Sequence, residues 1–163
     1  MYIKIGLSIL VVALVWYFFW RMGHQSEVKV VTGLPILHLQ DSLPDSVIDY
    51  EADCKVIAYL KERPSGNYFT LQNWTKYYSE FQEVSFLFYF HGRDTTLLRA
   101  AMDNYNFHHP IIWDPEGEFV KANPNCCDDI TFISGVLDSN GNIQLSNPTL
   151  GNLTRLLSNC SND

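Results

Sequence analysis

Residues 84–91 read VSFLFYFH, and this stretch decides the fold class. Nearly every position is apolar or aromatic, and polar side chains do not alternate with apolar ones. A strand that is covered on both faces reads this way, whereas a strand with one solvent-exposed face alternates. Such strands belong to parallel sheets that helices cover, so the stretch predicts an α/β domain.

The segments around this strand alternate between strand and helix patterns. Residues 54–60, CKVIAYL, predict a buried strand, and residues 68–82 predict a helix with an aromatic face that points inward. Residues 94–105 predict a second helix, and residues 109–114 predict a short strand. With right-handed crossovers, this order predicts a parallel sheet with helices on both faces. The expected inward aromatic residues of the first helix are Phe69, Trp74, Tyr77, Tyr78 and Phe81.

The carboxyl-terminal part of the chain predicts a hairpin followed by a helix. Residues 131–138 have a strand pattern, and the SNGN that follows contains the Asn-Gly pair typical of tight hairpins. Residues 143–146 then return antiparallel, and residues 147–159 predict a helix whose leucines face inward. Parallel strands followed by this hairpin make the expected sheet a mixed one.

Composition limits the chain to one folded domain with an acidic surface. The chain has 163 residues, of which 47% are hydrophobic, which is enough for one core and too little for two domains of ordinary size. Lys4 and Arg21 are two of the 11 basic residues, so nine remain after Arg21 against 18 acidic ones, a net charge of −9. An acidic domain repels phosphate backbones, so we expect no nucleic-acid partner.

The amino-terminal segment predicts a membrane anchor. Residues 5–20, IGLSILVVALVWYFFW, carry no charge, and with the residues before them they make about 20 apolar positions, or roughly 30 Å of helix. Bulky residues follow the run, so the small-residue cleavage site of a signal peptide is missing. We expect residues 1–23 to be an uncleaved transmembrane anchor and the folded part to face the periplasm or the exterior.

The remaining chain divides into a tether and a domain. Residues 24–50 contain short strand-like pieces and two prolines without a sustained period, so we expect a tether that contributes an edge strand at most. Residues 51–163 then form the folded domain.

The order of these elements, the run VIAYL followed by Trp74, the strand VSFLFYF and the hairpin GVLDSNGNI resemble one family. They are similar to the thioredoxin-like redoxins of the membrane-tethered thiol–disulfide oxidoreductase group. The resemblance covers roughly residues 50 to 158. It implies a thioredoxin-like three-layer α/β/α sandwich with a mixed sheet, a terminal hairpin and a final helix.

The resemblance breaks at the two marks of redox activity. Members of this group carry Cys-x-x-Cys at the amino end of the first helix, where the helix dipole lowers the pKa of the first thiol. Aligned back from Trp74, these positions fall near Pro64 and Asn67. Members also carry a cis-proline before the fourth strand, a place that falls near Phe132 or Ile133 here. Because thiol exchange needs a thiolate, the resemblance implies a degenerate member without the usual dithiol chemistry.

A degenerate member can still use its groove for binding. The resemblance therefore implies a binding or accessory module whose partner is an extracytoplasmic protein or an extended peptide. The groove residues that we expect are Pro64, Ser65, Gly66, Asn67, Tyr68, Phe132 and Ile133.

Cys126 and Cys127 offer an alternative function. In this fold the loop before the fourth strand lies on the same face as the turn before the first helix. Adjacent cysteines can form a strained disulfide that is easily reduced, which would make the chain a thiol–disulfide oxidoreductase or a redox sensor. Asp128 and Asp129 oppose this function because negative charge raises the pKa of a thiol. Without redox activity, the pair would be one structural and one free thiol, or would form a crosslink to another chain.

Cys54 and Cys160 lie at the two ends of the predicted domain. In the resembled fold the last helix runs antiparallel to the first strand, so its end returns to the edge where that strand begins. We therefore expect a structural disulfide between Cys54 and Cys160, with two unpaired cysteines as the alternative.

The histidines and acids outside these motifs predict no metal or cofactor. His91 ends one strand and His108 precedes the next parallel one, so they should lie at opposite edges of the sheet. The four cysteines lack the spacing of a zinc site. Asp114 and Glu116 fit a turn better than a pair of catalytic carboxylates.

Overall fold

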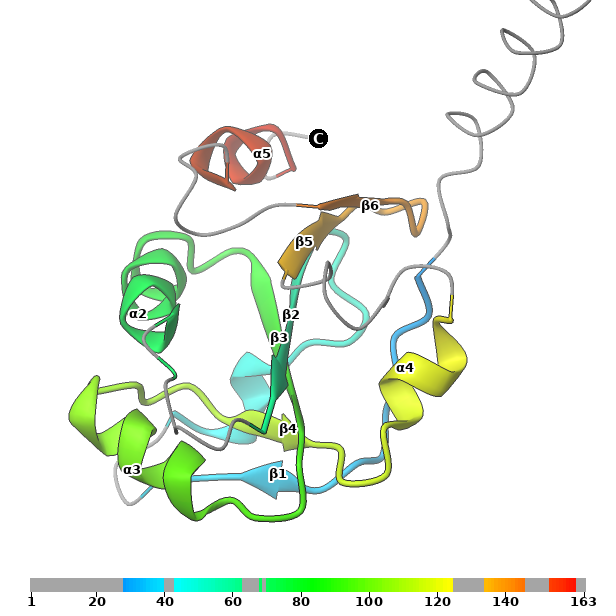
Figure 1. The fold of residues 1–163 in the computed structure, drawn as a ribbon. Helices are drawn as coiled ribbons and strands as arrows, with labels where there is room; N and C mark the ends of the chain where they lie inside the picture. The colour runs from blue at the N-terminus through cyan, green and yellow to red at the C-terminus, as the bar shows by residue number, and fades with distance from the viewer. Residues whose placement is uncertain are drawn as a thin grey trace, which may run out of the picture.

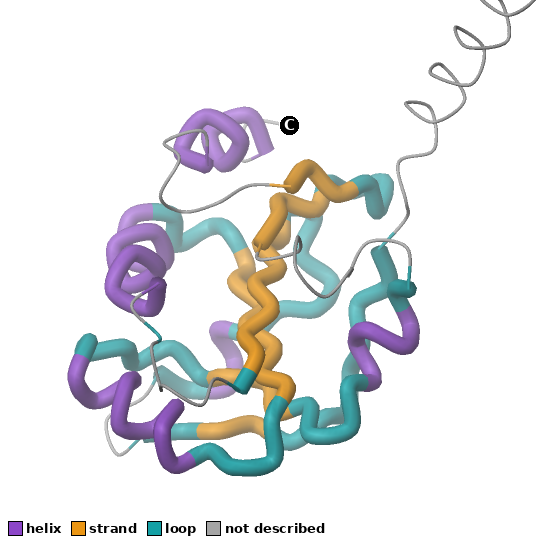
Figure 2. Tube along the Cα trace, viewed as in Figure 1, coloured by secondary structure: helices purple, strands orange, loops and turns teal. Residues whose placement is uncertain are grey.

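The computed structural model describes residues 28–39, 43–62, 68, 70–124, 134–145 and 153–160, and Figures 1 and 2 show their arrangement. The elements in chain order are β1 (Ile36–Leu37), the 3₁₀ turn η1 (Asp45–Val47), β2 (Lys55–Lys61), α2 (Thr70–Glu80), β3 (Ser85–His91), α3 (Thr96–Asn104), β4 (Ile111–Trp113), α4 (Glu118–Ala122), β5 (Ser134–Leu137), β6 (Ile143–Leu145) and α5 (Leu153–Cys160).

The strands form one mixed sheet in the order β1-β4-β3-β2-β5-β6. β2 and β3 are parallel, as are β3 and β4, whereas β1, β5 and β6 pair antiparallel with their neighbours. β3 arises from the stretch VSFLFYFH and lies inside the sheet, with all its residues buried except His91. The mixed sheet and the antiparallel β5–β6 hairpin that the sequence predicts are confirmed.

Side chains of β2 divide between the two faces of the sheet with the period of a strand. Val56, Ala58 and Leu60 enter one core cluster, while Ile57 and Tyr59 enter the other. Residues of α2, α3 and α5 complete the first cluster, and Phe119 of α4 belongs to the second. In Figure 1, α2 and α3 accordingly lie on one side of the sheet and α4 on the other.

The prediction that the two crossovers place helices on both faces is wrong. β2, β3 and β4 follow one another in a single direction across the sheet. Two crossovers of the same hand that advance in the same direction put their helices on the same face. The second face is covered instead by α4 and by residues 28–34 and 47–50, so the third layer of the sandwich is thin.

The helix α4 has no counterpart in the sequence prediction, which ended at a turn. The Asp114 side chain is fully buried, and its two carboxylate oxygens accept hydrogen bonds from the backbone N–H groups of Glu118 at 2.7 Å and Phe119 at 2.9 Å. This carboxylate therefore stabilises the amino end of α4. Five residues are too few to show a helical period, so the acid before the turn was the only usable signal.

Residues 28–31, which the sequence places in a tether, pack across the second face of the sheet. The side-chain amide of Asn123 forms two hydrogen bonds with the backbone of Lys29, accepting at 2.7 Å and donating at 2.9 Å. The Tyr89 hydroxyl donates to the carbonyl of Val31 at 2.8 Å and accepts from its N–H at 3.2 Å. Val28 is buried. Further along, β1 pairs with β4 as an edge strand of the sheet. The described part of the segment thus belongs to the folded unit.

Replacing Asn123 by Ala should release this segment from the sheet. We expect the free energy of unfolding to fall by about 1 to 2 kcal/mol, because two backbone groups lose their partners while water reaches them only in part. Hydrogen exchange should accelerate at the Lys29 amide and stay unchanged in β3. Asn104→Ala, at an exposed position of α3, is the control. Equal protection of Lys29 in Asn123→Ala and Asn104→Ala would contradict the assigned role.

The predicted membrane anchor, residues 1–23, lies outside the described residues. Among the residues that the structure does describe, no helix has the length and apolar character needed to cross a bilayer.

Candidate functional site

The carboxyl ends of the parallel strands meet at one edge of the sheet and form a polar pocket. The last residues of β2 and β3, Lys61 and His91, are paired in register, and Trp113 at the end of β4 pairs with Phe90. The residues that follow these strands enclose a volume of about 770 Å³. The pocket is lined by Lys61, Glu62, His91, Gly92, Arg93, Pro115 and Glu116.

Hydrogen bonds hold the floor of this pocket in place. The Glu62 N–H donates to the His91 carbonyl at 2.8 Å, and the Glu62 carboxylate accepts from the Arg93 N–H at 2.9 Å. The Arg93 guanidinium lies 4.0 Å from the carboxylate of Glu116, with both side chains mostly exposed. Such an exposed pair contributes little stability. The pocket therefore offers charges of both signs on a fixed backbone.

The His91 imidazole forms one wall of the pocket. Its Nδ1 lies 3.1 Å from the Asp114 carbonyl, which can only accept, so Nδ1 is the nitrogen that donates to this carbonyl. The ring stacks on Tyr59 with centroids 6.2 Å apart. A Cβ on Gly117 would lie 3.1 Å from Cε1 of this ring, so the close approach favours glycine there. In the sequence His91 was considered only as a possible metal ligand, and no local pattern indicated its place in the wall of this pocket.

Most of the expected groove residues lie outside the described part of the chain, and so do Cys126 and Cys127. Those groove residues are Pro64, Ser65, Gly66, Asn67, Phe132 and Ile133. Tyr68 is described, and its side chain is only 3% exposed and meets Phe90 edge to face. Its ring therefore belongs to the first core cluster and not to a binding surface, so the prediction for Tyr68 is wrong, while the rest of the groove stays a prediction.

The two histidines that the sequence analysis compared lie at opposite edges of the sheet. His91 is at the carboxyl end of β3, whereas His108 precedes the amino end of β4. The ring of His108 is paired with the side chain of Asn106 at 2.9 Å. Within the described ranges, no three His, Cys, Asp or Glu side chains gather as a possible metal-binding group.

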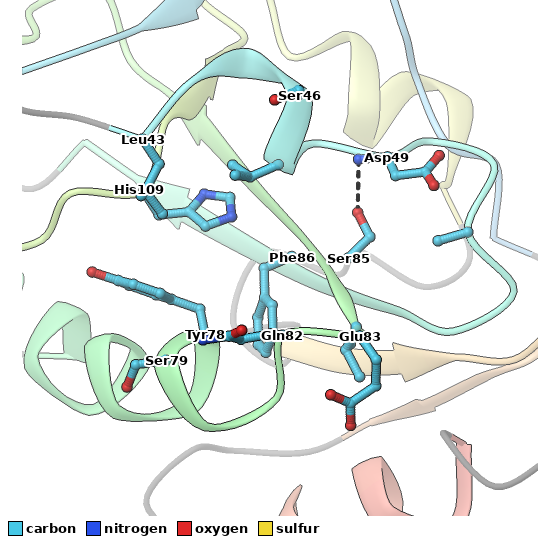
Figure 3. Close-up of a pocket in the computed structure, with 13 residues that line it drawn as sticks. Leu43, Ser46, Asp49, Tyr78, Ser79, Gln82, Glu83, Ser85, Phe86 and His109 are labelled. Atoms are coloured by element: carbon cyan, nitrogen blue, oxygen red, sulfur yellow. Dashed lines mark hydrogen bonds between the residues drawn. The ribbon is translucent and has the colours of Figure 1, made fainter.

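His109 is buried at the amino edge of the sheet. Its side chain is 2% exposed and lies among aromatic rings, with centroids 4.9 Å from Phe88 and 5.4 Å from Tyr78. Burial disfavours the imidazolium and lowers the pKa of His109 to about 4, against a smaller opposing effect of its hydrogen bond to the Pro110 carbonyl. Figure 3 shows its ring directed into a second pocket, at the edge opposite to the polar one.

Replacing His109 by Phe should remove part of the pH dependence of stability. Since the pKa of His109 is depressed in the folded protein, the unfolded state binds the proton first as pH falls below about 6.5. Stability from this residue is therefore complete above that pH and decreases by about 3 kcal/mol as pH falls to about 4. Urea unfolding of wild type and His109→Phe at pH 7, 6, 5 and 4 measures the difference. Parallel curves for the two proteins would contradict this account.

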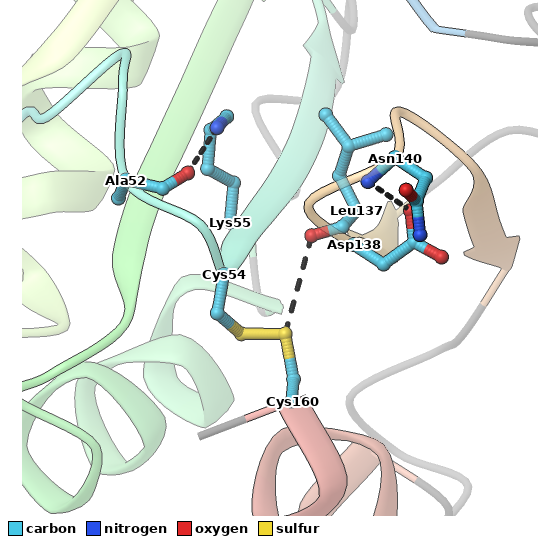
Figure 4. The surroundings of a disulfide bond; sticks show 7 residues. All are labelled: Ala52, Cys54, Lys55, Leu137, Asp138, Asn140 and Cys160. Atoms are coloured by element: carbon cyan, nitrogen blue, oxygen red, sulfur yellow. Dashed lines mark hydrogen bonds between the residues drawn. A yellow bond between two sulfur atoms is a disulfide. The ribbon is translucent and has the colours of Figure 1, made fainter. Parts of the chain in front are cut away.

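A disulfide joins Cys54, just before β2, to Cys160 at the end of α5, as Figure 4 shows. The two Cα atoms are 5.6 Å apart across a sequence separation of 106 residues. The predicted pairing of these cysteines is confirmed. The bond lies at the amino edge of the parallel strands, opposite to the edge that carries the polar pocket. The bond therefore fastens α5 to the sheet. Neither of its two sulfur atoms lies at the carboxyl edge, where the polar pocket is.

The sequence matches no protein-family model, and no curated protein matches it. Solved structures do match. The solution structure of a thioredoxin-like protein in its oxidised form superposes with a TM-score of 0.57 at 11% identity, covering 83% of this chain and 94% of that one. The C-terminal domain of a protein from Bacteroides thetaiotaomicron that carries the name thiol-disulfide oxidoreductase gives 0.54 at 12% identity, covering 84% and 99%.

A third match is the mitochondrial 2-Cys peroxiredoxin of Plasmodium falciparum, with a TM-score of 0.52 at 14% identity, covering 85% of this chain and 92% of that one. At these identities the matches establish the fold alone. The chain has a thioredoxin-like fold, as the resemblance in the sequence implied.

Proposed function

We propose that this chain is a membrane-anchored, extracytoplasmic module of thioredoxin-like fold that binds a protein or an extended peptide. The observation that carries the proposal is the sequence after β2. A thioredoxin-like oxidoreductase has its cysteine pair there, and none of residues 55–125 is cysteine. Without a thiolate at this position the usual exchange cannot start, while the surface around it can still bind.

The polar pocket at the carboxyl edge supports binding beside the expected groove. It holds Lys61 and Arg93 against Glu62 and Glu116, so its charges balance and do not exclude either sign of ligand. A partner that lies along this edge would meet a backbone fixed by the Glu62–His91 hydrogen bond. A surface held in place before binding loses less entropy when the partner arrives.

The location outside the cytoplasm rests on the anchor and on the disulfide. Residues 1–23 have the length and composition of a membrane-spanning helix. The Cys54–Cys160 bond is typical of oxidising compartments such as the periplasm or the exterior. Alkaline extraction of membranes tests the anchor: the full chain should stay in the membrane pellet.

Photo-crosslinking from the pocket rim tests the binding function. A photoreactive amino acid at Arg93 should give a discrete adduct in the cells that produce the protein, and the same residue at Lys76 should give none. Both side chains are exposed, but Lys76 lies on α2, away from the pocket. The binding proposal fails if Arg93 yields no adduct, or if both positions yield the same one.

The second candidate is a thiol oxidoreductase or redox sensor that uses Cys126 and Cys127. Because the other two of the four cysteines are joined in the disulfide, only this adjacent pair is left for cycling. Reduction of a small disulfide by the full chain should be slow and unchanged in Cys126→Ser/Cys127→Ser. A rate that falls several-fold in the double variant would establish this second function in place of the first.

A further inference from the structure

The second pocket lies at the amino edge of the sheet and has the size of a ligand site. It encloses about 610 Å³, within the range of roughly 300 to 1,000 Å³ typical of small-molecule pockets. The turn η1, the end of α2 and the start of β3 surround it, as Figure 3 shows. The Cys54–Cys160 bond lies at the same edge, but neither cysteine lines this cavity, and the polar pocket lies at the opposite edge.

His109 supplies the pocket with a hydrogen-bond acceptor. Its Nδ1 lies 2.9 Å from the Pro110 carbonyl, so Nδ1 holds the proton of the neutral ring and Nε2 keeps a lone pair. Among the residues that the structure describes, Nε2 has no hydrogen-bond partner. The side chain is 98% shielded from solvent, yet its ring faces the cavity in Figure 3. Because the ring faces the cavity, an N–H or O–H group of a ligand can reach this acceptor.

The rest of the lining defines which molecule fits. Leu43, Val47 and Phe86 give apolar walls, and the rings of Phe86 and Tyr78 lie next to the His109 ring. Ser85 is buried, and its hydroxyl accepts the Asp49 N–H at 2.9 Å, which leaves the hydroxyl proton to donate.

Charge at the pocket selects against anions. Asp49 and Glu83 line it, whereas no lysine or arginine is among its described lining residues. Two carboxylates at the wall of a partly apolar cavity repel a negative ligand and leave neutral and cationic ligands acceptable.

We propose that this pocket binds a small aromatic molecule that carries an N–H or O–H donor and no negative charge. The donor pairs with Nε2 of His109, and the aromatic ring packs against the apolar part of the lining, which includes Phe86 and Val47. This site is separate from the carboxyl-edge surface and does not depend on the function proposed for that surface.

Indole is a suitable probe, with two matched compounds as controls. 1-Methylindole has the same ring system without the N–H donor, and indole-3-acetate adds a negative charge. The full-length chain in detergent micelles is titrated while NMR follows the ring resonances of its histidines. Indole should shift the His109 resonance saturably and leave that of His91, at the opposite edge, unchanged. 1-Methylindole should bind roughly 3- to 10-fold more weakly, the effect of one neutral hydrogen bond.

Two protein variants complete the test. Ser46 is exposed on η1 and lines the pocket, so Ser46→Trp should fill the cavity and abolish the His109 shift without disturbing the core. His109→Phe should weaken the binding of indole by the same factor that separates indole from 1-methylindole in the wild type. In this variant, binding is followed through the side-chain NMR resonances of Val47, which lines the pocket.

Three results would overturn the proposal. The first is the absence of a saturable shift of the His109 resonance at indole concentrations up to about 10 mM. Even a weak specific site, with a dissociation constant of about 1 mM, would be mostly occupied at that concentration. The second is an equal shift of His91, which indicates non-specific partition of the compound. The third is equal affinity for indole and 1-methylindole, which shows that His109 does not accept the donor.

Discussion

Replacing Cys54 and Cys160 by Ala should lower the free energy of unfolding by about 4 to 5 kcal/mol. The disulfide closes a loop of 106 residues in sequence, and in the chain-entropy model a loop of that length removes about this much free energy from the unfolded state. Leu153 and Leu157 of α5 are fully buried in the first core cluster, so the helix should stay in place in the variant. Guanidinium unfolding of both proteins measures the difference in free energy.

Two controls separate the bond from its cysteines. Adding reductant to the wild type should produce the same loss of stability as the double substitution. Cys126→Ser/Cys127→Ser, at the other cysteine pair, should unfold at the wild-type concentration of denaturant. If Cys54→Ala/Cys160→Ala also unfolds at that concentration, the bond does not stabilise the domain.

Replacing Trp74 by Ala should cost about 3 to 5 kcal/mol of unfolding free energy. The indole ring is fully buried between α2 and the sheet, with its centroid 5.6 Å from Phe88, 6.0 Å from Tyr77 and 6.4 Å from Phe86, all in edge contacts. Truncation leaves a cavity between α2, which carries Tyr77, and β3, which carries Phe86 and Phe88, and these rings cannot fill it without shifting the helix or the strand. Domains are typically stable by about 5 to 15 kcal/mol, so Trp74→Ala should unfold near room temperature under mild denaturant.

Circular dichroism during urea unfolding measures this loss without relying on tryptophan fluorescence. Lys76→Ala is the matched control, because Lys76 is exposed two residues further along the same helix. It should change the free energy of unfolding by no more than about 0.5 kcal/mol. A similar small change in Trp74→Ala would show that the ring does not join α2 to the sheet.

The strands were predictable because their signals are local and strong. VSFLFYFH is apolar at nearly every position, and its place inside the sheet follows from that composition. The Asn-Gly pair predicted the β5–β6 hairpin. The resemblance to the thioredoxin-like fold predicted that Cys54 and Cys160, 106 residues apart in sequence, lie close together.

Features set by tertiary contacts were not predictable in the same way. The face that α3 covers depends on strand order, which no local period encodes. The pairing of Asn123 with Lys29 joins residues 94 positions apart through a single amide, and neither residue stands out in the sequence. The burial of His109 among aromatic rings arises from the packing of α2 and β3 around it, and no local pattern indicates it.

The disulfide also changes how the chain would respond to mechanical force. The bond between Cys54 and Cys160 closes a covalent ring that contains β2 to β6 and the helices α2 to α5, while β1 lies outside it. Tension applied between the two ends of the chain would pass from one sulfur to the other and bypass the ring. Roughly 350 Å of extended chain is thereby withheld from stretching. The segment before Cys54, including the part held by Asn123, stays outside this loop and can still be pulled away from the fold.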